Sequence, residues 1–536
     1  MRGNSASGWT LFPYTGQMPP KRPHVAVAIA AALALVAVLI AATAGAQGAP
    51  AESPFVWRGV IQGQYGPQFS AAERRRLLRF EGRHGFNAYV HAPKDDPYQR
   101  TLWRDPYPPD QQAELDAEVA LAAKRGIEWI PNVSPATPAF ASPGEAAPPG
   151  VTGSAPICFS SDADLRQLLV KLAPFETAGS RTFMVSFDDV QRSFACPADS
   201  EAYGSGDAAF GRANADLLDR LLARLRDRDP GARLLTVASD YQGTADTDYL
   251  RGLRDHLGAG IEVMWTGPGT ESRPFSPTEA DQYAQLVGRV PVVWENWTTN
   301  DALGPDPEHP ARIFLGPYAR RAAIAGHVGG FFFNPANQSD LNYLPLATAG
   351  DWMRDPAHYR PRRAFLRETR RFAGRQAPAL RAFAEANYSS SLRGSVEAPT
   401  LERLIRRFLR APAGKARPVR AHRAAAVAHL RHGLRLAAHA RGRLLRIRAL
   451  HPFVRQARPF LRSVRLNARA GLVATDLLEA THRSKQRHLR RHLHRALRRA
   501  ARWPAESFGT RSGVYGLTRN VIDRYVARVR ERDRRR

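Results

Sequence analysis

The sequence lacks the residue patterns that mark several common classes of protein. Its 536 residues include only two cysteines, and no Cys/His spacing resembles that of a zinc site. No Gly-rich phosphate loop follows the first predicted strand, so nothing indicates a nucleotide-binding open sheet. From these absences we expect neither a metal ion nor another cofactor. Any chemistry would then depend on the protein's own side chains.

Acidic residues are scarce at one end of the chain. The formal net charge is +29, with 78 Lys and Arg against 49 Asp and Glu. Residues 401–536 hold 37 of the basic and 7 of the acidic residues, a charge of +30, which leaves residues 1–400 at −1. A charge of this size is typical of nucleic-acid binding. Because it belongs to the tail alone, the remainder has the charge balance of an ordinary soluble enzyme.

One long uncharged run lies near the N-terminus. A basic N-region, residues 1–24, precedes an apolar run over residues 25–46. As a helix this run spans about 33 Å, enough for a bilayer core, and the preceding cations predict that the chain after it lies outside the cytoplasm. Its length favours an uncleaved signal-anchor, whereas the small residues before Gln47 fit a signal peptide cleaved near Ala46. Either alternative predicts an extracytoplasmic protein, anchored or secreted, with residues 47–54 as a linker.

An extracytoplasmic location gives meaning to Cys158 and Cys196. In an exported protein a pair of cysteines is a candidate disulfide. Two buried free thiols are the alternative, and the sequence leaves both open.

Residues 55–350 alternate between strand-like and helix-like segments. Capping boxes at residues 70–73 and 276–279 predict two helix starts. Eight strands are expected at residues 55–63, 86–92, 127–133, 182–187, 233–238, 261–265, 290–294 and 327–333. Eight strands alternating with helices over about 300 residues is the count of a (β/α)8 TIM barrel, an α/β fold. A doubly wound open sheet is the alternative.

Two adjacent carboxylates, Asp188 and Asp189, end the fourth predicted strand. The mostly apolar residues 182–187 before them are typical of a strand buried on both faces. Because neighbouring side chains in a strand point to opposite faces, both acids can reach one ligand only if the chain bends between them. The alternative is an exposed Asp-Asp turn.

Polar residues also follow most of the other strands. In a barrel of this kind the active site lies at the C-terminal ends of the strands. The polar residues at these ends are Gln62, Lys94, Asp188, Asp189, Asp240, Tyr241, Thr266, Glu295, Asn296 and Asn334. Any one of them could be a turn residue or a helix cap, but together they indicate a site that binds hydroxyl or amide groups. The nearby Trp265, Trp294 and Trp297 could form apolar walls for a sugar, or simply pack in the core.

Seven short motifs follow one another along this part of the chain: Gly59–Gly66, Ala92–Asp96, Phe187–Asp189, Trp265–Pro268, Trp294–Asn296, Phe314–Tyr318 and Asn334–Pro335. In residues and order they resemble glycoside hydrolase family 84. That family comprises the O-GlcNAcases and related bacterial β-N-acetylglucosaminidases, including clostridial enzymes called hyaluronidases. The resemblance implies a (β/α)8 barrel, which agrees with the strand count.

The resemblance also implies a retaining mechanism in which the substrate's own 2-acetamido oxygen attacks the anomeric carbon and forms an oxazoline. Asp188 would orient and polarise the acetamido N–H, and Asp189 would protonate the leaving oxygen and then deprotonate the attacking water. One acid must stay ionised while the other holds a proton near neutral pH. Mutual repulsion and partial burial can separate two carboxyl pKa values in this way.

Two sets of substrate-binding residues follow from the same resemblance. Sugar hydroxyls would contact Gly59, Lys94, Asp301 and Asn334. The acetamido pocket would be lined by Tyr241, Thr266, Trp294 and Asn296. The expected partner is therefore a β-linked N-acetylglucosamine glycan or glycoconjugate.

The chain departs from the family pattern at two positions of the first motif. Gln62 and Gln64 stand where the family usually has Glu and Phe. Gln62 keeps hydrogen-bonding capacity without charge, so we expect altered substrate contacts rather than lost chemistry. A disulfide between the two cysteines would lie in the loops after the third and fourth strands and could brace the loop carrying Asp189.

The chain after the barrel changes character. Residues 351–400 predict a helical extension, and residues 401–536 a basic, all-α tail with Leu401, Leu404, Ile405 and Phe408 at helical spacing. The charge of the tail could be a solvated face, or it could bind an anionic envelope polymer or a lipid surface. Nucleic acid is the third alternative, which export argues against.

Two classes of function stay open for the whole chain. The first is an exported retaining β-N-acetylglucosaminidase. The second is a non-catalytic glycan- or polyanion-binding surface protein that uses a barrel as its scaffold. The intact Asp188-Asp189 pair favours the enzyme, because loss of catalysis would commonly remove at least one of the acids.

Overall fold

The computed structural model describes residues 53–137, 155–304, 306, 309–392, 396–412, 414–509 and 520–535. The predicted apolar segment, residues 25–46, lies outside the described residues together with the basic N-region and most of the linker. The anchor or signal peptide therefore stays a prediction. In the described part of the chain, no helix is long and apolar enough to cross a membrane. Residues 53–536 cluster as one unit.

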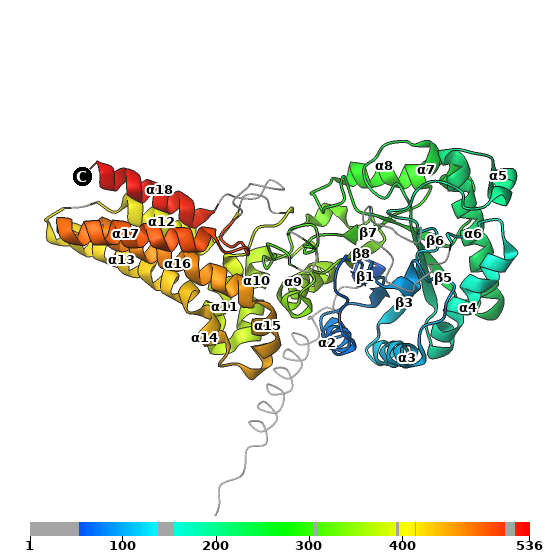
Figure 1. Cartoon of the computed structure of the whole chain (residues 1–536), viewed down its shortest axis with the longest axis horizontal. Coiled ribbons are helices and arrows are strands. Elements are labelled where there is room, and N and C mark those ends of the chain that lie inside the picture. Colours follow the sequence, from blue (N-terminus) through cyan, green and yellow to red (C-terminus); the bar gives the residue numbers. More distant parts are fainter. Residues whose placement is uncertain are drawn as a thin grey trace, which may run out of the picture. The chain divides into compact units, whose positions relative to one another are not determined.

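Within the described residues, eight parallel strands close into a barrel (Figure 1). The strands are β1 (Trp57–Gln62), β2 (Ala88–His91), β3 (Glu128–Val133), β4 (Thr182–Ser186), β5 (Arg233–Val237), β6 (Ile261–Trp265), β7 (Val292–Glu295) and β8 (Gly330–Phe333). Each predicted strand overlaps one of them, and β7 extends one residue beyond its predicted end. Because β1 pairs with both β2 and β8, the predicted barrel is confirmed and the open sheet was wrong.

One glycine allows the barrel to close. Gly330 starts β8 with φ near +154°, and a side chain there would collide with the backbone of Trp57 on β1. The register pairs these two residues directly. Only glycine tolerates both the backbone conformation and the close approach.

Helices surround the barrel: α2 (Ala71–Glu81), α3 (Pro109–Ala123), α4 (Asp162–Ala178), α5 (Pro197–Tyr203), α6 (Asp207–Arg228), α7 (Asp248–Arg254), α8 (Pro277–Val287) and α9 (Tyr343–Arg354). Both predicted capping boxes form, at the starts of α2 and α8. In α2 the Ser70 side chain accepts from the backbone of Glu73, whose carboxylate accepts from the Ser70 backbone at 2.9 Å. These bonds satisfy backbone N–H groups that the helix itself leaves unpaired.

Side chains alternate between the two faces of the strands. Inside the barrel lie mainly aliphatic residues, including Ile61, Val90, Ile130, Met184, Leu235, Met264, Val292 and Phe332. The positions between them, such as Val60, Tyr89, Phe183 and Val293, pack under the surrounding helices. This period of two decides which residues beyond the strand ends can meet above the barrel.

The remainder of the chain is helical: α10 (Pro361–Ala373), α11 (Ala377–Glu385), α12 (Pro399–Arg410), α13 (Arg417–Ala438), α14 (Ala440–Leu444), α15 (His451–Gln456), α16 (Arg458–Glu479), α17 (Arg483–Ala501) and α18 (Val521–Arg534). Leu401, Ile405 and Phe408 are buried in a core that α12 shares with α13, α16 and α18. The basic tail is therefore built on a hydrophobic core, which it shares with α10, α11 and residues at the edge of the barrel such as Ile313 and Leu344.

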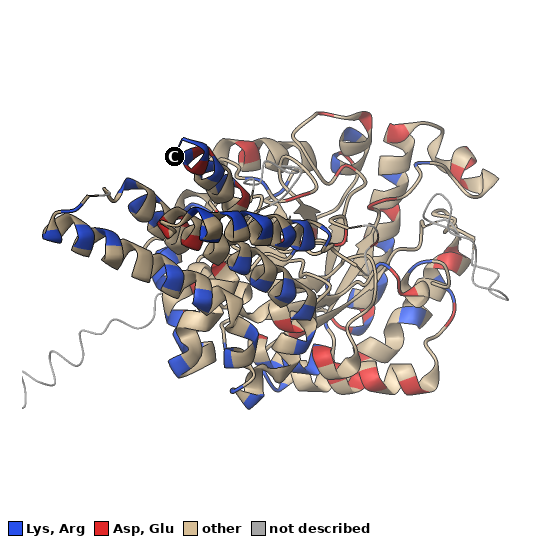
Figure 2. Ribbon diagram, turned by 60° about the vertical axis from the view of Figure 1, so that its left-hand side comes forward, with Lys and Arg blue, Asp and Glu red and all other residues tan. Residues whose placement is uncertain are grey.

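Charged residues lie on the outer faces of these helices, as Figure 2 shows. The few acidic residues connect neighbouring helices: Glu479 and Asp476 of α16 pair with Arg423 and Arg431 of α13. Asp533 of α18 pairs in the same way with α17. Since residues 401–536 hold 37 basic and 7 acidic residues, most of these arginines have no acidic partner within the tail.

The helical region packs directly against the barrel. Gln456 of α15 accepts from the backbone N–H of Asp340 at 2.8 Å and donates to Glu73 at 2.7 Å. Near the start of the region, Glu397 forms a buried ion pair with Arg312 and accepts a hydrogen bond from the backbone of Tyr388 at 2.6 Å. The bond between Gln456 and Glu73 joins residues 383 positions apart in the sequence.

Candidate active site

The alternation that points every second side chain into the barrel can be followed past the C-terminal ends of the strands. Steps of two lead from Met184, inside the barrel, to Ser186 and Asp188. The same steps lead from the interior to Gly63, Lys94, Tyr241, Thr266, Asn296 and Asn334. Six of the eight residues named here were predicted as site residues, and the other two, Ser186 and Gly63, were not.

Asp188 is held at the centre of this group. It is buried, with 7% of its side chain exposed, and Lys94 forms an ion pair with its Oδ2 atom. The other carboxylate oxygen, Oδ1, is also buried and has no hydrogen-bond partner in the described part of the chain. A buried acceptor of this kind is rarely left unsatisfied, so it is suited to receive an N–H or O–H from a ligand.

Asp189 turns into the same site because the backbone bends at this residue. Its φ is +57°, a left-handed conformation that is unusual for aspartate and common at functional sites. The predicted bend between the two acids is therefore present. Tyr241 donates to Oδ1 of Asp189 at 3.0 Å, Tyr65 donates to Oδ2 at 2.8 Å, and Lys94 lies 3.7 Å from Oδ2. Unlike its neighbour, the Asp189 side chain is 35% exposed and can meet solvent.

The surroundings of Asp189 favour its ionised form. Burial acts to raise its pKa, but the Lys94 cation and the hydrogen bonds from Tyr65 and Tyr241 outweigh burial, and the net pKa is lowered. The sequence predicted a carboxyl that holds a proton near neutral pH, and the unliganded site differs. Three donors that converge on one carboxylate could not be anticipated from the Asp-Asp pair alone.

Both tyrosines remain protonated and can donate. Burial, together with the negative charge of Asp189, raises the pKa of Tyr65 and of Tyr241 well above 10. Tyr65 was quoted in the first family motif but not predicted as a site residue. Because Tyr65 lies two residues after the inward-facing Gly63, the alternation of side-chain direction could have identified it. Arg100 was missed as well: its Nη1 donates to the Lys94 carbonyl at 3.3 Å, and its guanidinium carbon lies 5.8 Å from the centre of the Tyr65 ring.

A chain of amide groups borders the site. Gly63 N–H donates to Oδ1 of Asn334 at 3.0 Å, and Nδ2 of Asn334 donates to Oδ1 of Asn296 at 2.9 Å. Asn296 also accepts from the Trp294 indole at 2.8 Å and donates to the Thr270 carbonyl at 2.7 Å. These bonds fix the orientation of two amides and one indole before any ligand arrives.

Trp294 and Thr266 shape the site through packing and backbone contacts. A side chain at position 63 would collide with the Trp294 ring, so glycine is needed there. The Lys94 ammonium lies 5.6 Å from the centre of the same ring. The N–H of Thr266 donates to the Tyr241 carbonyl at 2.8 Å, and its hydroxyl donates to the Gly269 carbonyl at 2.9 Å. Thr266 thus positions the loop that carries Tyr241.

Gly59 is not brought into this group. It lies within β1, three residues before the strand ends, where its α-carbon faces the ring of Phe332 and the carbonyl of Ala88. Gly63, four residues later, contacts Asn334 and Trp294 at the strand ends instead. The two glycines belong to the same motif, and only the contacts with Trp294 and Asn334 distinguish them.

Asp301 lies next to the site and holds the backbone of Tyr65 in place. Its Oδ2 accepts from the Tyr65 backbone and its Oδ1 from the Ala302 backbone, both at 2.9 Å. Burial raises the pKa of Asp301 despite these bonds. The loop bearing Tyr65 is therefore held by a carboxylate that was predicted to contact the sugar.

Two predicted polar strand-end residues face away from the barrel interior. Gln62 accepts from Tyr89 at 2.7 Å, and Glu295 forms a buried ion pair with Arg320. Each stands one residue from an inward-facing position, so the alternation of the strand directs it outward. Both residues stabilise the wall of the barrel through these buried contacts, and neither contacts Asp188 or Asp189.

Cys158 and Cys196 form a disulfide across a sequence separation of 38 residues. Cys196 is seven residues after Asp189, so the bond ties the loop after β4 to the segment before α4. Among the described residues, one group of His, Cys, Asp or Glu atoms is compact enough for a metal ion: Cys158, Cys196 and Asp199. Because the two sulfurs are bonded to each other, they offer no thiolate ligand.

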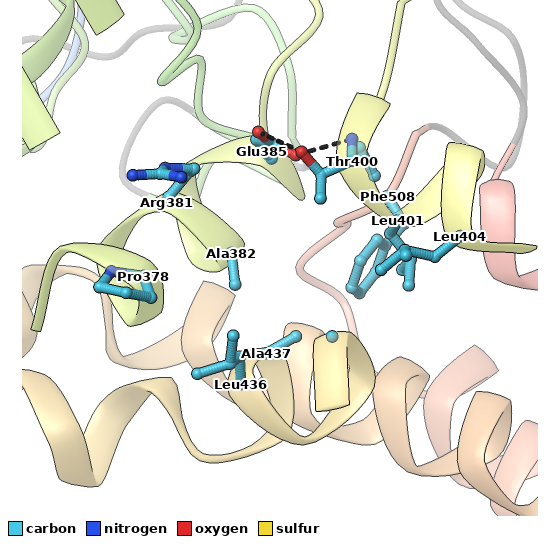
Figure 3. Close-up of a pocket in the computed structure, with 12 residues that line it drawn as sticks. Pro378, Arg381, Ala382, Glu385, Thr400, Leu401, Leu404, Leu436, Ala437 and Phe508 are labelled. Carbon is cyan, nitrogen blue, oxygen red and sulfur yellow. Dashed lines mark hydrogen bonds between the residues drawn. The ribbon is translucent and has the colours of Figure 1, made fainter. Parts of the chain in front are cut away.

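A cavity of about 110 Å³ in the helical region does not resemble this site (Figure 3). Its walls are mostly apolar, and Glu385 is the one carboxylate among its described lining residues. That carboxylate already accepts from the backbone and the hydroxyl of Thr400, both at 2.9 Å. The cavity offers no pair of acids for glycoside chemistry.

The sequence matches a known family over most of the barrel and the helical extension. A family model described as beta-N-acetylglucosaminidase matches residues 58–385. Two curated relatives, each named Protein O-GlcNAcase, from Rattus norvegicus and Mus musculus, are 28% identical over 301 residues. The alignment covers 55% of this chain but only 29% of each relative, so the chain accounts for less than a third of the length of those proteins.

Two solved structures share the fold. A mutant of the Thermobaculum terrenum O-GlcNAc hydrolase matches with a TM-score of 0.70 at 24% identity, covering 89% of this chain and 94% of that one. The protein CpGH84B matches with a TM-score of 0.72 at 21% identity, covering 89% of this chain and 77% of that one. Since 89% exceeds the share of the barrel, the likeness extends into the helical region.

Proposed function

We propose, from the premise that the chain belongs to glycoside hydrolase family 84, the β-N-acetylglucosaminidases, that it hydrolyses β-linked N-acetylglucosaminides with retention of configuration. The observation that carries the proposal is the difference between two adjacent carboxylates. Asp188 is buried with one free acceptor atom, and Asp189 is half-exposed and bound by tyrosine hydroxyls. Two acids in unlike surroundings suit two unlike roles.

In the first role, Asp188 accepts the acetamido N–H of the substrate at its free Oδ1. This bond turns the acetamido oxygen towards the anomeric carbon and increases its electron density. As the oxygen attacks, positive charge develops on the acetamido nitrogen, and the ionised carboxylate stabilises it in the oxazoline. Lys94 holds Asp188 in place through the ion pair at Oδ2.

In the second role, Asp189 protonates the leaving oxygen and later accepts a proton from the attacking water. Its exposed edge admits both the leaving group and water. The lowered pKa of the unliganded carboxyl must rise for this step. A sugar that buries Asp189 and takes over the hydroxyls of Tyr65 and Tyr241 removes two of the groups that lower the pKa.

The remaining predicted residues bind the sugar or hold those that do. Lys94 and Asn334 serve the sugar hydroxyls, with Gly63 in the position first assigned to Gly59. The acetamido pocket is formed by Tyr241, Thr266, Trp294 and Asn296, whose amide and indole are already oriented by hydrogen bonds. Asp301 acts through Tyr65.

The substrate class is a glycan or glycoconjugate with a β-linked N-acetylglucosamine. The relatives named Protein O-GlcNAcase support protein-linked sugar as one candidate. The action takes place outside the cytoplasm if residues 25–46 form the predicted anchor or signal peptide. The basic tail would then face anionic polymers or lipid headgroups of the envelope. A non-catalytic role is disfavoured because both acids and their donors are present together.

The proposal is tested with two aryl β-N-acetylglucosaminides, one with a good and one with a poor leaving group. Wild-type protein should release both phenols. Asp189→Asn should slow the poor leaving group far more than the good one, because only the poor one needs a proton. Asp188→Asn should slow both alike. An inactive wild type, or an Asp189→Asn variant as active as wild type on both substrates, would refute the proposal.

A further inference from the structure

A second cavity, of about 410 Å³, lies where the barrel helix α2 meets the helical region. Arg76, Arg79 and Phe80, which share one face of α2, line one side together with Arg83 in the turn after the helix. The opposite side comes from α9, α10 and α11 and from the segment that includes Leu450 and Phe453. The volume is within the range of small-molecule sites, and the cavity shares no residue with the candidate active site.

The base of the cavity is apolar and aromatic. The ring of Phe80 stacks between His84, at a centroid distance of 4.0 Å, and Tyr343, at 4.9 Å. Leu380, Leu450 and Phe453 face this stack from the helical region and belong to its core. A ligand that enters the cavity must therefore carry an apolar body.

The rim of the cavity is positively charged and largely uncompensated. Arg76 is neutralised by Asp340, which it contacts at 3.1 and 3.3 Å. No carboxylate in the described ranges lies within ion-pair distance of Arg79 or Arg83. Arg371 reaches only Glu368, at 4.0 Å. Three guanidinium groups thus remain available to one anionic head.

A buried polar atom also lies in this wall. His84 is 7% exposed, and its Nδ1 lies 2.8 Å from the Phe80 carbonyl. A carbonyl only accepts, so Nδ1 carries the hydrogen and donates. The other ring nitrogen, Nε2, is buried, and none of the described residues offers it a partner. In the neutral ring Nε2 is an acceptor, and it donates to an anionic head only when the negative charge of that head protonates the ring.

We propose that this cavity binds an amphiphilic anion, an acyl chain that ends in a carboxylate or a phosphate. The chain lies on the aromatic stack and against Leu380, Leu450 and Phe453. The head lies between Arg79, Arg83 and Arg371, next to His84. The site is independent of the proposed glycosidase activity.

The test is titration of the full-length protein with dodecanoate by calorimetry, below the concentration at which the probe forms micelles. Saturable binding with one site is expected, and the uncharged dodecanol should bind at least about tenfold more weakly, because it lacks the charge that the arginines recognise. Arg79→Gln combined with Arg83→Gln should weaken dodecanoate about tenfold or more. The matched control, Arg406→Gln combined with Arg410→Gln on α12, removes the same charge elsewhere and should leave the affinity within about twofold.

A second variant distinguishes loss of the cavity from loss of the fold. Leu450→Trp fills the apolar side of the cavity and should abolish dodecanoate binding, while the melting temperature and the hydrolysis of an aryl glycoside stay near wild type. Lysophosphatidylglycerol, titrated in parallel, distinguishes the sources: tighter binding than dodecanoate indicates a membrane lipid, and weaker binding a free fatty acid. Absence of saturable binding, equal affinity in the two arginine double variants, or unchanged binding in Leu450→Trp would overturn the proposal.

Discussion

In the barrel, Arg320 and Glu295 form an ion pair whose side chains are at most 1% exposed, whereas in the tail Arg431 and Asp476 pair with a third or more of each side chain in solvent. In the barrel most buried charges are paired, as Arg74 is with Glu118, although the carboxylate of Glu81 on α2 is buried without a partner among the described residues. The tail carries an excess of arginine on outer faces over an apolar core. Single charges should therefore matter much more in the barrel than in the tail.

The largest expected difference is in stability. Arg320→Met leaves Glu295 buried with only Tyr318 as a hydrogen-bond donor, and should lower the free energy of unfolding by about 3–5 kcal/mol. Arg431→Met in the tail should cost less than about 1 kcal/mol, because water replaces the lost partner. Chemical denaturation followed by circular dichroism compares the two. Equal losses would remove the distinction between the regions.

The next difference concerns activity. Asp188→Asn keeps the shape of the side chain but removes the charge that supports the oxazoline, so kcat should fall roughly 10²–10³-fold. Arg406→Gln combined with Arg410→Gln in the tail should leave kcat on a neutral aryl glycoside within about twofold. Both variants should melt near the wild-type temperature. If the tail variant lost as much kcat as Asp188→Asn, the charges of the tail would matter to catalysis as much as those of the barrel, which would contradict this comparison.

A smaller effect is expected at helix starts. Ser276 caps α8 by accepting from the backbone of Glu279, so Ser276→Ala should cost about 1 kcal/mol. His482, the N-cap residue before α17, makes no side-chain cap hydrogen bond, and His482→Ala should not change stability measurably. Thermal unfolding of the two variants checks the contrast. A loss at His482 as large as that at Ser276 would be inconsistent with it.

The smallest effect is a shift of the pH profile. Asp189 must be protonated to act as an acid, so the rate falls as pH rises through its pKa. The Tyr65 hydroxyl donates to the carboxylate and lowers that pKa. Tyr65→Phe should therefore move the alkaline limb of kcat/KM to higher pH. Tyr203→Phe, which removes a hydroxyl bound to Asp216 on the outer helices, should not move the limb. A shift of the alkaline limb to lower pH in Tyr65→Phe would contradict the predicted direction.

The strand positions and the two acids could be predicted because both depend on local sequence. Strand-like runs that alternate with helix-like segments marked the eight strands, and Asp188 and Asp189 directly follow the most apolar of these runs. The bend that brings Asp189 into the site was predicted from the alternation of a strand, and its positive φ confirms it.

The prediction of site residues failed where a shift of one or a few positions along the chain changes which residues a side chain contacts. Gln62 and Glu295 each stand one position from an inward-facing residue, and their outward direction depends on which strand positions face the interior. Gly59 and Gly63 lie in one motif, and only the Trp294 ring distinguishes them. The lowered pKa of Asp189 depends on Lys94, Tyr65 and Tyr241, which come from three separate loops. Tertiary contacts of this kind leave no local signal.

The central claim is that the acetamido group of the substrate is the nucleophile and that Asp188 supports it. The most direct measurement is kcat/KM for aryl β-glucosaminides whose N-acetyl group carries zero, one, two or three fluorine atoms. Fluorine withdraws electrons from the attacking oxygen, so the account predicts a rate that falls with each fluorine and a first product of retained configuration by NMR. A rate independent of fluorination, or an inverted product, would contradict the account.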